Sequence, residues 1–188
     1  MEQLDVLSDV AETLDRLGLP WMLVGSWASG LYGYPRMTHD IDVVLAYRES
    51  DVEALVAAFE ERYDVDEYML LDAARRKLMA NIVHKELGDK VDLWPLKDEE
   101  YAQVALQRRV REEIQGVTMW VATAEDVVLS KLRWAALSQS EMQWNDVLGV
   151  VRMREDLDLR YLRHWAQALG LGAELEKLLT EAQEEAGG

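Results

Sequence analysis

Residues 25–45 read Gly-Ser-Trp-Ala-Ser-Gly-Leu-Tyr-Gly-Tyr-Pro-Arg-Met-Thr-His-Asp-Ile-Asp-Val-Val-Leu, and the rest of the chain is best understood from this stretch. A glycine–serine turn follows an apolar segment and opens a short helix. Asp40 and Asp42 then stand at the start of a second apolar run, which is typical of a buried strand. In a strand, residues i and i+2 share a face with their Cα atoms ~7 Å apart, so the two carboxylates are expected side by side.

The paired carboxylates predict a divalent cation. Two carboxylates this close repel each other, and both stay ionised only when a cation compensates them. Their oxygen atoms suit Mg²⁺ or Mn²⁺. Asp92, in the strand-like run Lys90-Val-Asp-Leu-Trp94, is the best third ligand. Aspartate is disfavoured inside strands; a single one would indicate an edge or a turn, but three in two apolar strands favour a metal site.

The turn at Gly25 and Ser26 predicts a phosphate-binding element. A strand, a small-residue turn and a helix N-terminus point unpaired backbone N–H groups outward, and the helix dipole favours an anion there. Glycine permits close approach, and the Ser26 side chain adds a hydroxyl. The alternative is a helix that Ser26 merely caps. The Asp40 and Asp42 pair downstream favours the phosphate interpretation.

The pattern along the chain predicts an α+β fold, with a mixed sheet flanked by helices and a helical C-terminal part. Helices are expected over 1–17, 27–32, 51–61, 72–79 and 98–107, and strands over 21–24, 38–46, 80–84, 90–94, 108–114 and 117–121. Residues 63–70 are expected to be a short strand or extended connector. From 123 onward the pattern is helical, over 124–138, 142–154, 158–169 and 172–185. We therefore expect an α/β domain over 1–122 and a helical subdomain over 123–188, packed on it.

Composition limits the classes of function. The formal net charge of −16 argues against extensive binding to nucleic acid or anionic membranes. The acidic charge is still compatible with nucleotide binding, since a metal and a few basic residues reverse the sign of the local charge. The chain has no cysteine, so disulfides and thiolate metal sites are excluded. The acidic, amphipathic start and the lack of a long apolar run predict a cytoplasmic protein without membrane spans.

These motifs together resemble the nucleotidyltransferase superfamily of the DNA polymerase β type. The resemblance rests on Gly25-Ser26, Gly30, Arg36, Thr38 and Asp40-x-Asp42, followed by Asp92 on a later strand. It covers residues 21 to about 93 and is greatest for the small bacterial and archaeal members, namely the minimal nucleotidyltransferases and the AbiEii-like group of toxin–antitoxin and phage-defence systems. Residues 123–132, with Asp146 downstream, also resemble the helical segment that follows the AbiEii-like core.

The resemblance implies a role for each motif residue. Asp40, Asp42 and Asp92 would hold Mg²⁺ or Mn²⁺, and Asp92 would help to deprotonate the acceptor. Gly25 and Ser26 would hold the β- and γ-phosphates of a nucleoside triphosphate (NTP).

Three further residues are predicted to contact the nucleotide. Arg36 and Thr38 lie on the loop that enters the aspartate-bearing strand; a surface arginine is the alternative for Arg36. Lys131 matches a family lysine that approaches the triphosphate, and a solvated helix lysine is the alternative. Asp146 is left with two options, facing the cleft or the solvent.

The function implied is an enzyme: metal-dependent transfer of a nucleoside monophosphate (NMP) from an NTP to a hydroxyl, with release of pyrophosphate. The acceptor is left open among a protein, an RNA end and a small molecule such as an aminoglycoside. Two alternatives stay open: a toxin–antitoxin or phage-defence component that mainly binds a partner protein, and a plain metal-binding α/β domain. The base of the NTP and the oligomeric state are not predicted.

Overall fold

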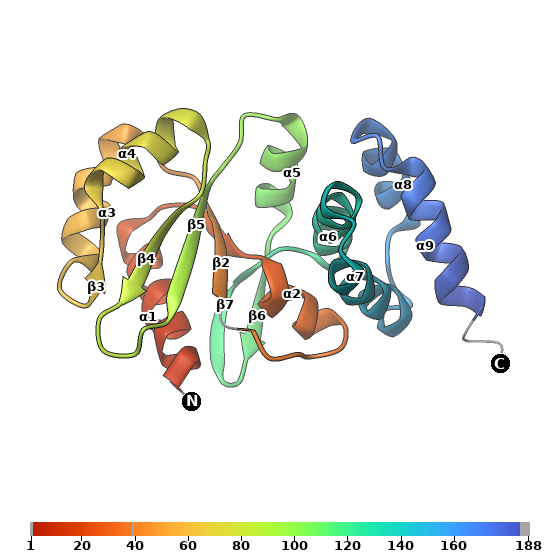
Figure 1. The fold of residues 1–188 in the computed structure, drawn as a ribbon, viewed down its shortest axis with the longest axis horizontal. Coiled ribbons are helices and arrows are strands. Elements are labelled where there is room, and N and C mark those ends of the chain that lie inside the picture. The colour runs from red at the N-terminus through yellow and green to blue at the C-terminus, as the bar shows by residue number, and fades with distance from the viewer. Residues whose placement is uncertain (1, 39, 185–188) are drawn as a thin grey trace. The chain divides into compact units, whose positions relative to one another are not determined.

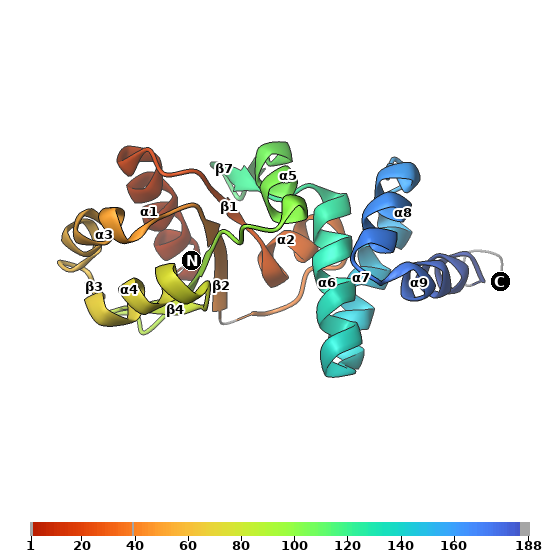
Figure 2. The ribbon, with the colours of Figure 1, turned by 90° about the horizontal axis from the view of Figure 1, so that it is seen from above.

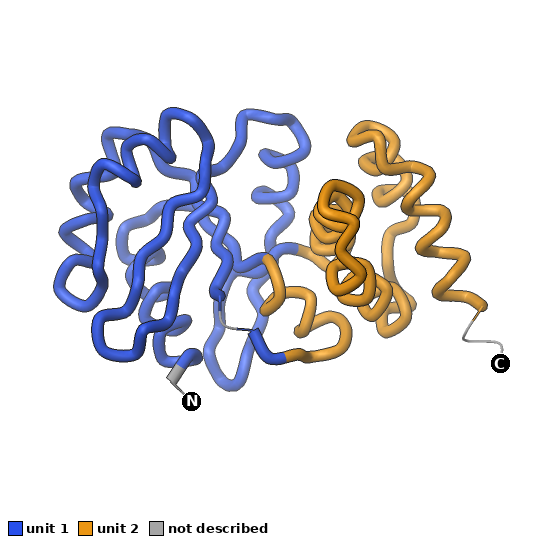
Figure 3. Tube along the Cα trace, viewed as in Figure 1, with its two compact units in different colours: residues 1–24, 37–122 blue, residues 25–36, 123–188 orange. Residues whose placement is uncertain are grey.

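The structure is a computed structural model that describes residues 2–38 and 40–184 (Figure 1). Contacts divide the chain into two compact units (Figure 3). The first, here called the sheet unit, comprises Met1–Val24 and Met37–Ala122. The second, the helical unit, comprises Gly25–Arg36 and Thr123–Gly188.

The sheet unit contains one mixed sheet. Its strand order is β3-β4-β5-β2-β1-β7-β6. The strands are β1 (Trp21–Leu23), β2 (Asp40–Leu45), β3 (Tyr63–Asp64), β4 (Ala80–His84), β5 (Lys90–Pro95), β6 (Val110–Ile114) and β7 (Val117–Val121). β2 runs parallel to β5 and antiparallel to β1. The predicted α+β class with a mixed sheet is therefore confirmed.

Helices surround the sheet in the same unit. They are α1 (Glu2–Leu17), α3 (Val52–Phe59), which follows the short 3₁₀ helix η1 (Glu49–Asp51), α4 (Glu67–Arg76) and α5 (Glu100–Arg108). Helix α1 contacts α3 and β7, while α4 contacts β4 and β5 (Figures 1 and 2). The buried core draws on both layers, with Leu7 and Leu14 of α1, Ile41 and Val43 of β2, and Leu55 of α3 all fully buried.

The strands that the sequence predicts over 108–114 and 117–121 form the antiparallel β6–β7 hairpin. Gln115 and Gly116 both have positive φ, +49° and +89°. Two consecutive left-handed residues define the type I′ turn that matches the twist of a two-residue hairpin.

The prediction for residues 63–70 is wrong in part. Only Tyr63–Asp64 forms a strand, and helix α4 already begins at Glu67. The side chain of Asp66 accepts a hydrogen bond from the Met69 backbone N–H at 3.0 Å and so caps this helix. An aspartate followed by an acidic first turn is a helix start signal, and it outweighs the short apolar run Tyr-Met-Leu-Leu.

The helical unit consists of α2 (Gly25–Tyr32), α6 (Ala124–Ser138), α7 (Glu141–Met153), α8 (Leu159–Ala168) and α9 (Gly172–Glu184). Side chains of Thr123, Ser140 and Asp158 accept backbone N–H groups and fix the starts of α6, α7 and α8. Helix α2 packs against α6 and α7. The core of the unit contains fully buried residues of α6, α7 and α9, namely Val128, Leu129, Leu132, Val147, Val150 and Leu175.

Within the described part of the chain, no helix combines the length and the apolar character that crossing a membrane requires.

Candidate active site

The predicted metal ligands lie on one face of the sheet unit. The parallel register of β2 and β5 pairs Asp40 with Lys90 and Asp42 with Asp92. Residues that are direct partners in adjacent strands point to the same face, so the three aspartates and Lys90 share it. Ile41 and its partner Val91 are fully buried on the other face. The alternation read from the sequence thus brings Asp92 beside Asp42.

Each carboxylate of this face has a different environment. The Asp40 side chain is about half exposed, at 52%. Asp42 accepts a hydrogen bond from the Trp94 indole N–H at 3.1 Å. Asp92 is the buried member, 6% exposed. Asn81 on β4 is the register partner of Asp92 on its other side, so a side-chain amide also belongs to this face.

Lys90 supplies positive charge to the carboxylates. Its Nζ lies 3.0 Å from Asp92 Oδ2 and 3.3 Å from Asp40 Oδ1. The hydrogen bond to Asp92 and, after it, the attraction of both carboxylates raise the pKa of the Lys90 ammonium above its usual range. Lys90 therefore partly neutralises a face where three acidic groups would otherwise repel one another.

The three aspartates fit a divalent cation in chemistry and in burial. Asp92 Oδ1 is buried and has no hydrogen-bond partner among the described residues, which is costly unless something else satisfies that oxygen. All the donors are hard oxygens, which Mg²⁺ prefers. In residues 2–38 and 40–184, however, no three Asp, Glu or His side chains lie close enough together to form a ready-made metal site. Binding a cation would require the carboxylates to draw together.

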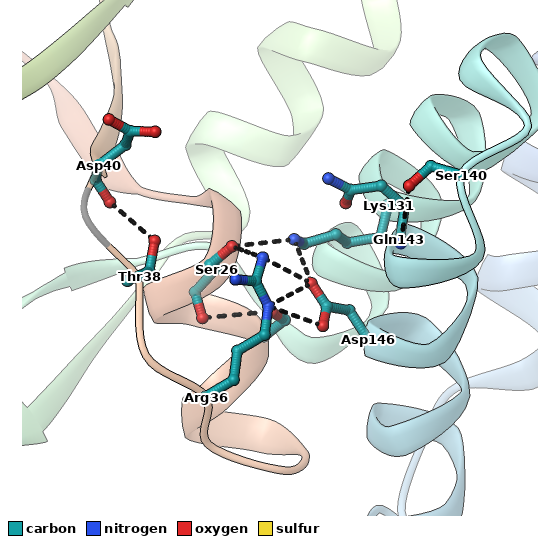
Figure 4. Close-up of polar contacts among 9 residues, drawn as sticks. Ser26, Arg36, Thr38, Asp40, Lys131, Ser140, Gln143 and Asp146 are labelled. Carbon is teal, nitrogen blue, oxygen red and sulfur yellow. Dashed lines mark hydrogen bonds and ion pairs between the residues drawn. The ribbon is translucent and has the colours of Figure 1, made fainter.

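The predicted phosphate-binding residues lie in the helical unit. Gly25 has φ of +65°, a left-handed conformation that favours glycine, and the chain turns there from Val24 into α2. Ser26 lies in the first turn of α2 and not ahead of the helix, so the alternative of a Ser26 that merely caps the helix is wrong. Its hydroxyl oxygen accepts hydrogen bonds from the Arg36 guanidinium and, at 3.4 Å, from Lys131 Nζ (Figure 4).

Asp146 joins these two cations. Its carboxylate accepts a hydrogen bond from Lys131 Nζ at 2.8 Å and from Arg36 Nε at 3.0 Å (Figure 4). Lys131 is 4% exposed, so the alternative of a solvated lysine is excluded. The Arg36 side chain is 32% exposed and pairs with Asp146, so it is not a simple surface arginine. We call Ser26, Arg36, Lys131 and Asp146 the cation cluster.

Close backbone contact between α2 and α7 holds the cation cluster together. A Cβ atom added to Gly33, directly after α2, would lie 2.8 Å from the backbone N of Val150 and 2.9 Å from the carbonyl carbon of Gly149. Real Cβ atoms do not approach backbone this closely, so Gly33 is required for the contact. Ser26 comes from α2 and Asp146 from α7, and this contact sets the separation of the two helices.

The structure therefore brings the predicted residues together in two sets. Asp40, Asp42 and Asp92 share a face in the sheet unit. Gly25, Ser26, Arg36 and Lys131 are grouped in the helical unit. Thr38 joins neither set through its side chain, which donates a hydrogen bond at 3.4 Å to the backbone carbonyl of Asp40.

Sequence reasoning gave no role to Lys90 and left Asp146 between the cleft and the solvent. A signal for Lys90 was present, since it stands two residues before Asp92 in the same strand and therefore shares its face. The pairing of Asp146 with Lys131 spans two helices, and no periodicity in the sequence indicates it.

The fold is that of a nucleotidyltransferase, as three solved structures show. They are an antigenic nucleotidyltransferase-like protein from Paracoccidioides brasiliensis (TM-score 0.56, 15% identity, covering 94% of this chain and 91% of that one), the antibiotic-resistance factor ANT(2'')-Ia (0.52, 18%, 99% and 94%), and a putative nucleotidyltransferase from Thermotoga maritima (0.53, 19%, 75% and 89%).

A match to a family model assigns the sequence to one family of nucleotidyltransferases. The family model of aminoglycoside-2''-adenylyltransferases matches residues 6–116, which is more than half of the chain. The chain belongs to that family and is a nucleotidyltransferase enzyme. The matched stretch includes Gly25, Ser26 and all three aspartates. No curated protein is similar enough to the sequence to count as a match.

Proposed function

We propose that the protein transfers AMP from ATP to a hydroxyl of a polycationic amino sugar of the aminoglycoside type, with release of pyrophosphate. Membership of the aminoglycoside-2''-adenylyltransferase family supports both the nucleotide and the acceptor class. The observation that carries the catalytic part is the register of β2 with β5, which sets Asp42 beside Asp92 with Asp40 two residues away on the same face.

The three aspartates would hold Mg²⁺ or Mn²⁺. A divalent cation bound there would supply charge neutralisation at the reacting phosphate. The orphaned oxygen of Asp92 and the hard-donor set support this assignment.

The chemical step is a displacement at the α-phosphorus. The acceptor oxygen forms a bond to the α-phosphorus while the bond to the bridging α,β-oxygen breaks, and pyrophosphate leaves with that oxygen. The acceptor hydroxyl loses its proton to the carboxylate of Asp92, which later releases it to solvent. The chain contributes mainly positioning and electrostatic stabilisation, as is general for transfer at phosphorus.

The cation cluster would bind the triphosphate. Ser26 offers a hydroxyl, while Lys131 and Arg36 offer charge-assisted donors. Gly25, with its left-handed backbone, lets a phosphate approach the start of α2. With Thr38 on the loop before Asp40, these are the nucleotide-binding residues that we propose.

The charge of the chain supports a cationic acceptor. At a net charge of −16 the protein attracts polyamines and repels polyanions. This favours an amino sugar over an RNA end as acceptor, because RNA binding generally needs a basic face.

The acceptor class is tested with ATP labelled on its α-phosphate, Mg²⁺ and a panel of acceptors: aminoglycosides, bulk tRNA and a protein extract. We expect label only on the aminoglycosides, and none with the Asp40→Asn/Asp42→Asn variant. Label on tRNA or on protein would refute the acceptor class and keep nucleotidyl transfer. The alternative of a toxin–antitoxin or phage-defence component that mainly binds a partner protein stays a prediction.

A further inference from the structure

We propose that Asp146 is a positioning residue of the nucleotide site: its carboxylate holds Lys131 and Arg36 in the orientation that receives the triphosphate. This inference rests on the proposed function, since it assigns the role of a group next to the proposed phosphate ligands.

The geometry of Asp146 supports this role. One carboxylate oxygen, Oδ2, accepts from Lys131 Nζ at 2.8 Å and from Arg36 Nη2 at 3.3 Å, while Arg36 Nε reaches Oδ1 at 3.0 Å. Both cations also donate to the Ser26 hydroxyl. A single carboxylate thus fixes two cations against one residue in the first turn of α2 (Figure 4).

Burial makes the pairing necessary for Lys131. The side chains of Lys131 and Asp146 are 5% and 9% exposed. A buried ammonium without a partner is strongly unfavourable, and such a side chain would move towards water. Asp146 therefore holds the Lys131 ammonium in place before any nucleotide arrives.

The cluster retains an attraction for anions. Lys131 and Arg36 together carry two positive charges and Asp146 one negative charge, so the cluster has a net charge of +1. An ammonium has three N–H donors, and the described residues accept from Lys131 at two atoms, Asp146 Oδ2 and Ser26 Oγ. One N–H is left for a phosphate oxygen. Protein kinases use a comparable arrangement, in which a glutamate holds the phosphate-binding lysine.

The test is a double-mutant cycle on nucleotide affinity. Calorimetry measures the Kd of ATP with Mg²⁺ for the wild type, Asp146→Asn, Lys131→Met and the double variant, with a thermal melt of each. We expect Asp146→Asn to weaken binding by about 10- to 100-fold, because small misplacements of ligand-binding groups have effects of this size. The same substitution in the Lys131→Met background should have a clearly smaller effect, since residues that act through each other are not additive.

A matched control separates positioning from stability. Glu176→Gln removes another carboxylate of the helical unit, one that accepts from Arg163 Nε at 2.8 Å, and it should leave the Kd unchanged. Asp146→Glu keeps the charge and should bind more tightly than Asp146→Asn. If the asparagine variant does not fold, Asp146→Ser takes its place.

The outcomes distinguish this inference from the proposed function. A wild type that does not bind ATP refutes the proposed function itself. If the wild type binds and Asp146→Asn binds within about 2-fold or more tightly, Asp146 does not position the cations. Equal losses in both backgrounds would show that Asp146 acts independently of Lys131. Each of the last two results overturns the inference.

Discussion

Lys90 changes the charge of the sheet face that carries Asp40, Asp42 and Asp92. Its ammonium lies between Asp40 and Asp92, within 3.3 Å and 3.0 Å of their oxygens. A bound divalent cation would compensate the same carboxylates. We therefore expect Lys90 and the metal to have overlapping effects on the stability of the sheet unit.

Lys90→Met should destabilise the metal-free protein by about 1 kcal/mol, the size expected of a half-exposed ion pair. Saturating Mg²⁺ should reduce this loss, because the cation then compensates the carboxylates. Thermal melts in chelator and in Mg²⁺ measure both values. Lys97→Met is the matched control, since Lys97 lies 4.0 Å from Glu99 in an exposed pair, and it should change neither melt. Equal losses for Lys90→Met with and without Mg²⁺ would contradict the overlap.

For single residues, the sequence predicted which residues form the candidate site better than it predicted which residues they contact. The i, i+2 spacing of Asp40 and Asp42 and the alternation around Asp92 were sufficient to place three aspartates on one face. The burial of Lys131 also agrees with the apolar helix around it. The links from Lys90 to Asp40 and from Asp146 to Lys131 depend on strand register and helix packing, which local patterns do not encode.

Among the elements, the contact of α2 with α7 matters most for the proposed nucleotide site. Gly33 and Gly149 allow the two backbones to meet: a Cβ on Gly149 would lie 2.9 Å from the Tyr34 ring, and one on Gly33 would collide with the α7 backbone. The spacing of these helices determines whether Ser26 can meet the cations that Asp146 holds.

Gly33→Ala should push α2 away from α7 and cost about 1–3 kcal/mol of stability, as overpacking typically does. It should also weaken ATP binding, because Ser26 moves relative to Lys131. Thermal melts and calorimetry test this.

Gly30→Ala provides the control in the same helix. Its Cβ would meet only Pro35 Cα, at an ordinary 3.5 Å, so it should be neutral or stabilise α2 by up to about 1 kcal/mol. If Gly33→Ala behaved like Gly30→Ala, the spacing argument would fail.

The elements themselves were largely predictable because their start and stop signals are local. The helix expected over 1–17 and the strands expected over 108–114 and 117–121 agree closely with α1, β6 and β7. The error over 63–70 arose where an apolar run overlapped the capping signal of Asp66. The apolar character of this run favoured a strand, but the Asp66 cap stabilises a helix there.

For the whole molecule, the order of the elements in the sequence did not predict which segments pack together in one unit. Residues 25–36 pack with α6 and α7, although they lie between two strands in the sequence. The boundary that we placed at 122–123 from composition, and the packing of 123–188 on the preceding residues, stay predictions. So do the cytoplasmic location and any partner protein.

Net charge leads to a prediction for the whole molecule. If the acceptor is polycationic, a chain of net charge −16 attracts it at long range. Raising the salt concentration from low to about 0.5 M should then raise the KM for the acceptor several-fold, since the Debye length falls below ~10 Å. Initial rates at saturating ATP measure this. An acceptor KM that does not change with salt would show that the acidic surface plays no part in recognition.

The proposed catalysis of AMP transfer by Asp40, Asp42 and Asp92 is tested directly by a labelling assay. Purified wild type and Asp42→Asn are incubated with Mg²⁺, an aminoglycoside and ATP labelled on the α-phosphate, with parallel melts to confirm folding. We expect labelled aminoglycoside and an equal amount of pyrophosphate from the wild type. The rate should fall by roughly 10²-fold or more in Asp42→Asn, because a charge-stabilising group is lost. Label transfer that persists at the wild-type rate in a folded Asp42→Asn variant would contradict it.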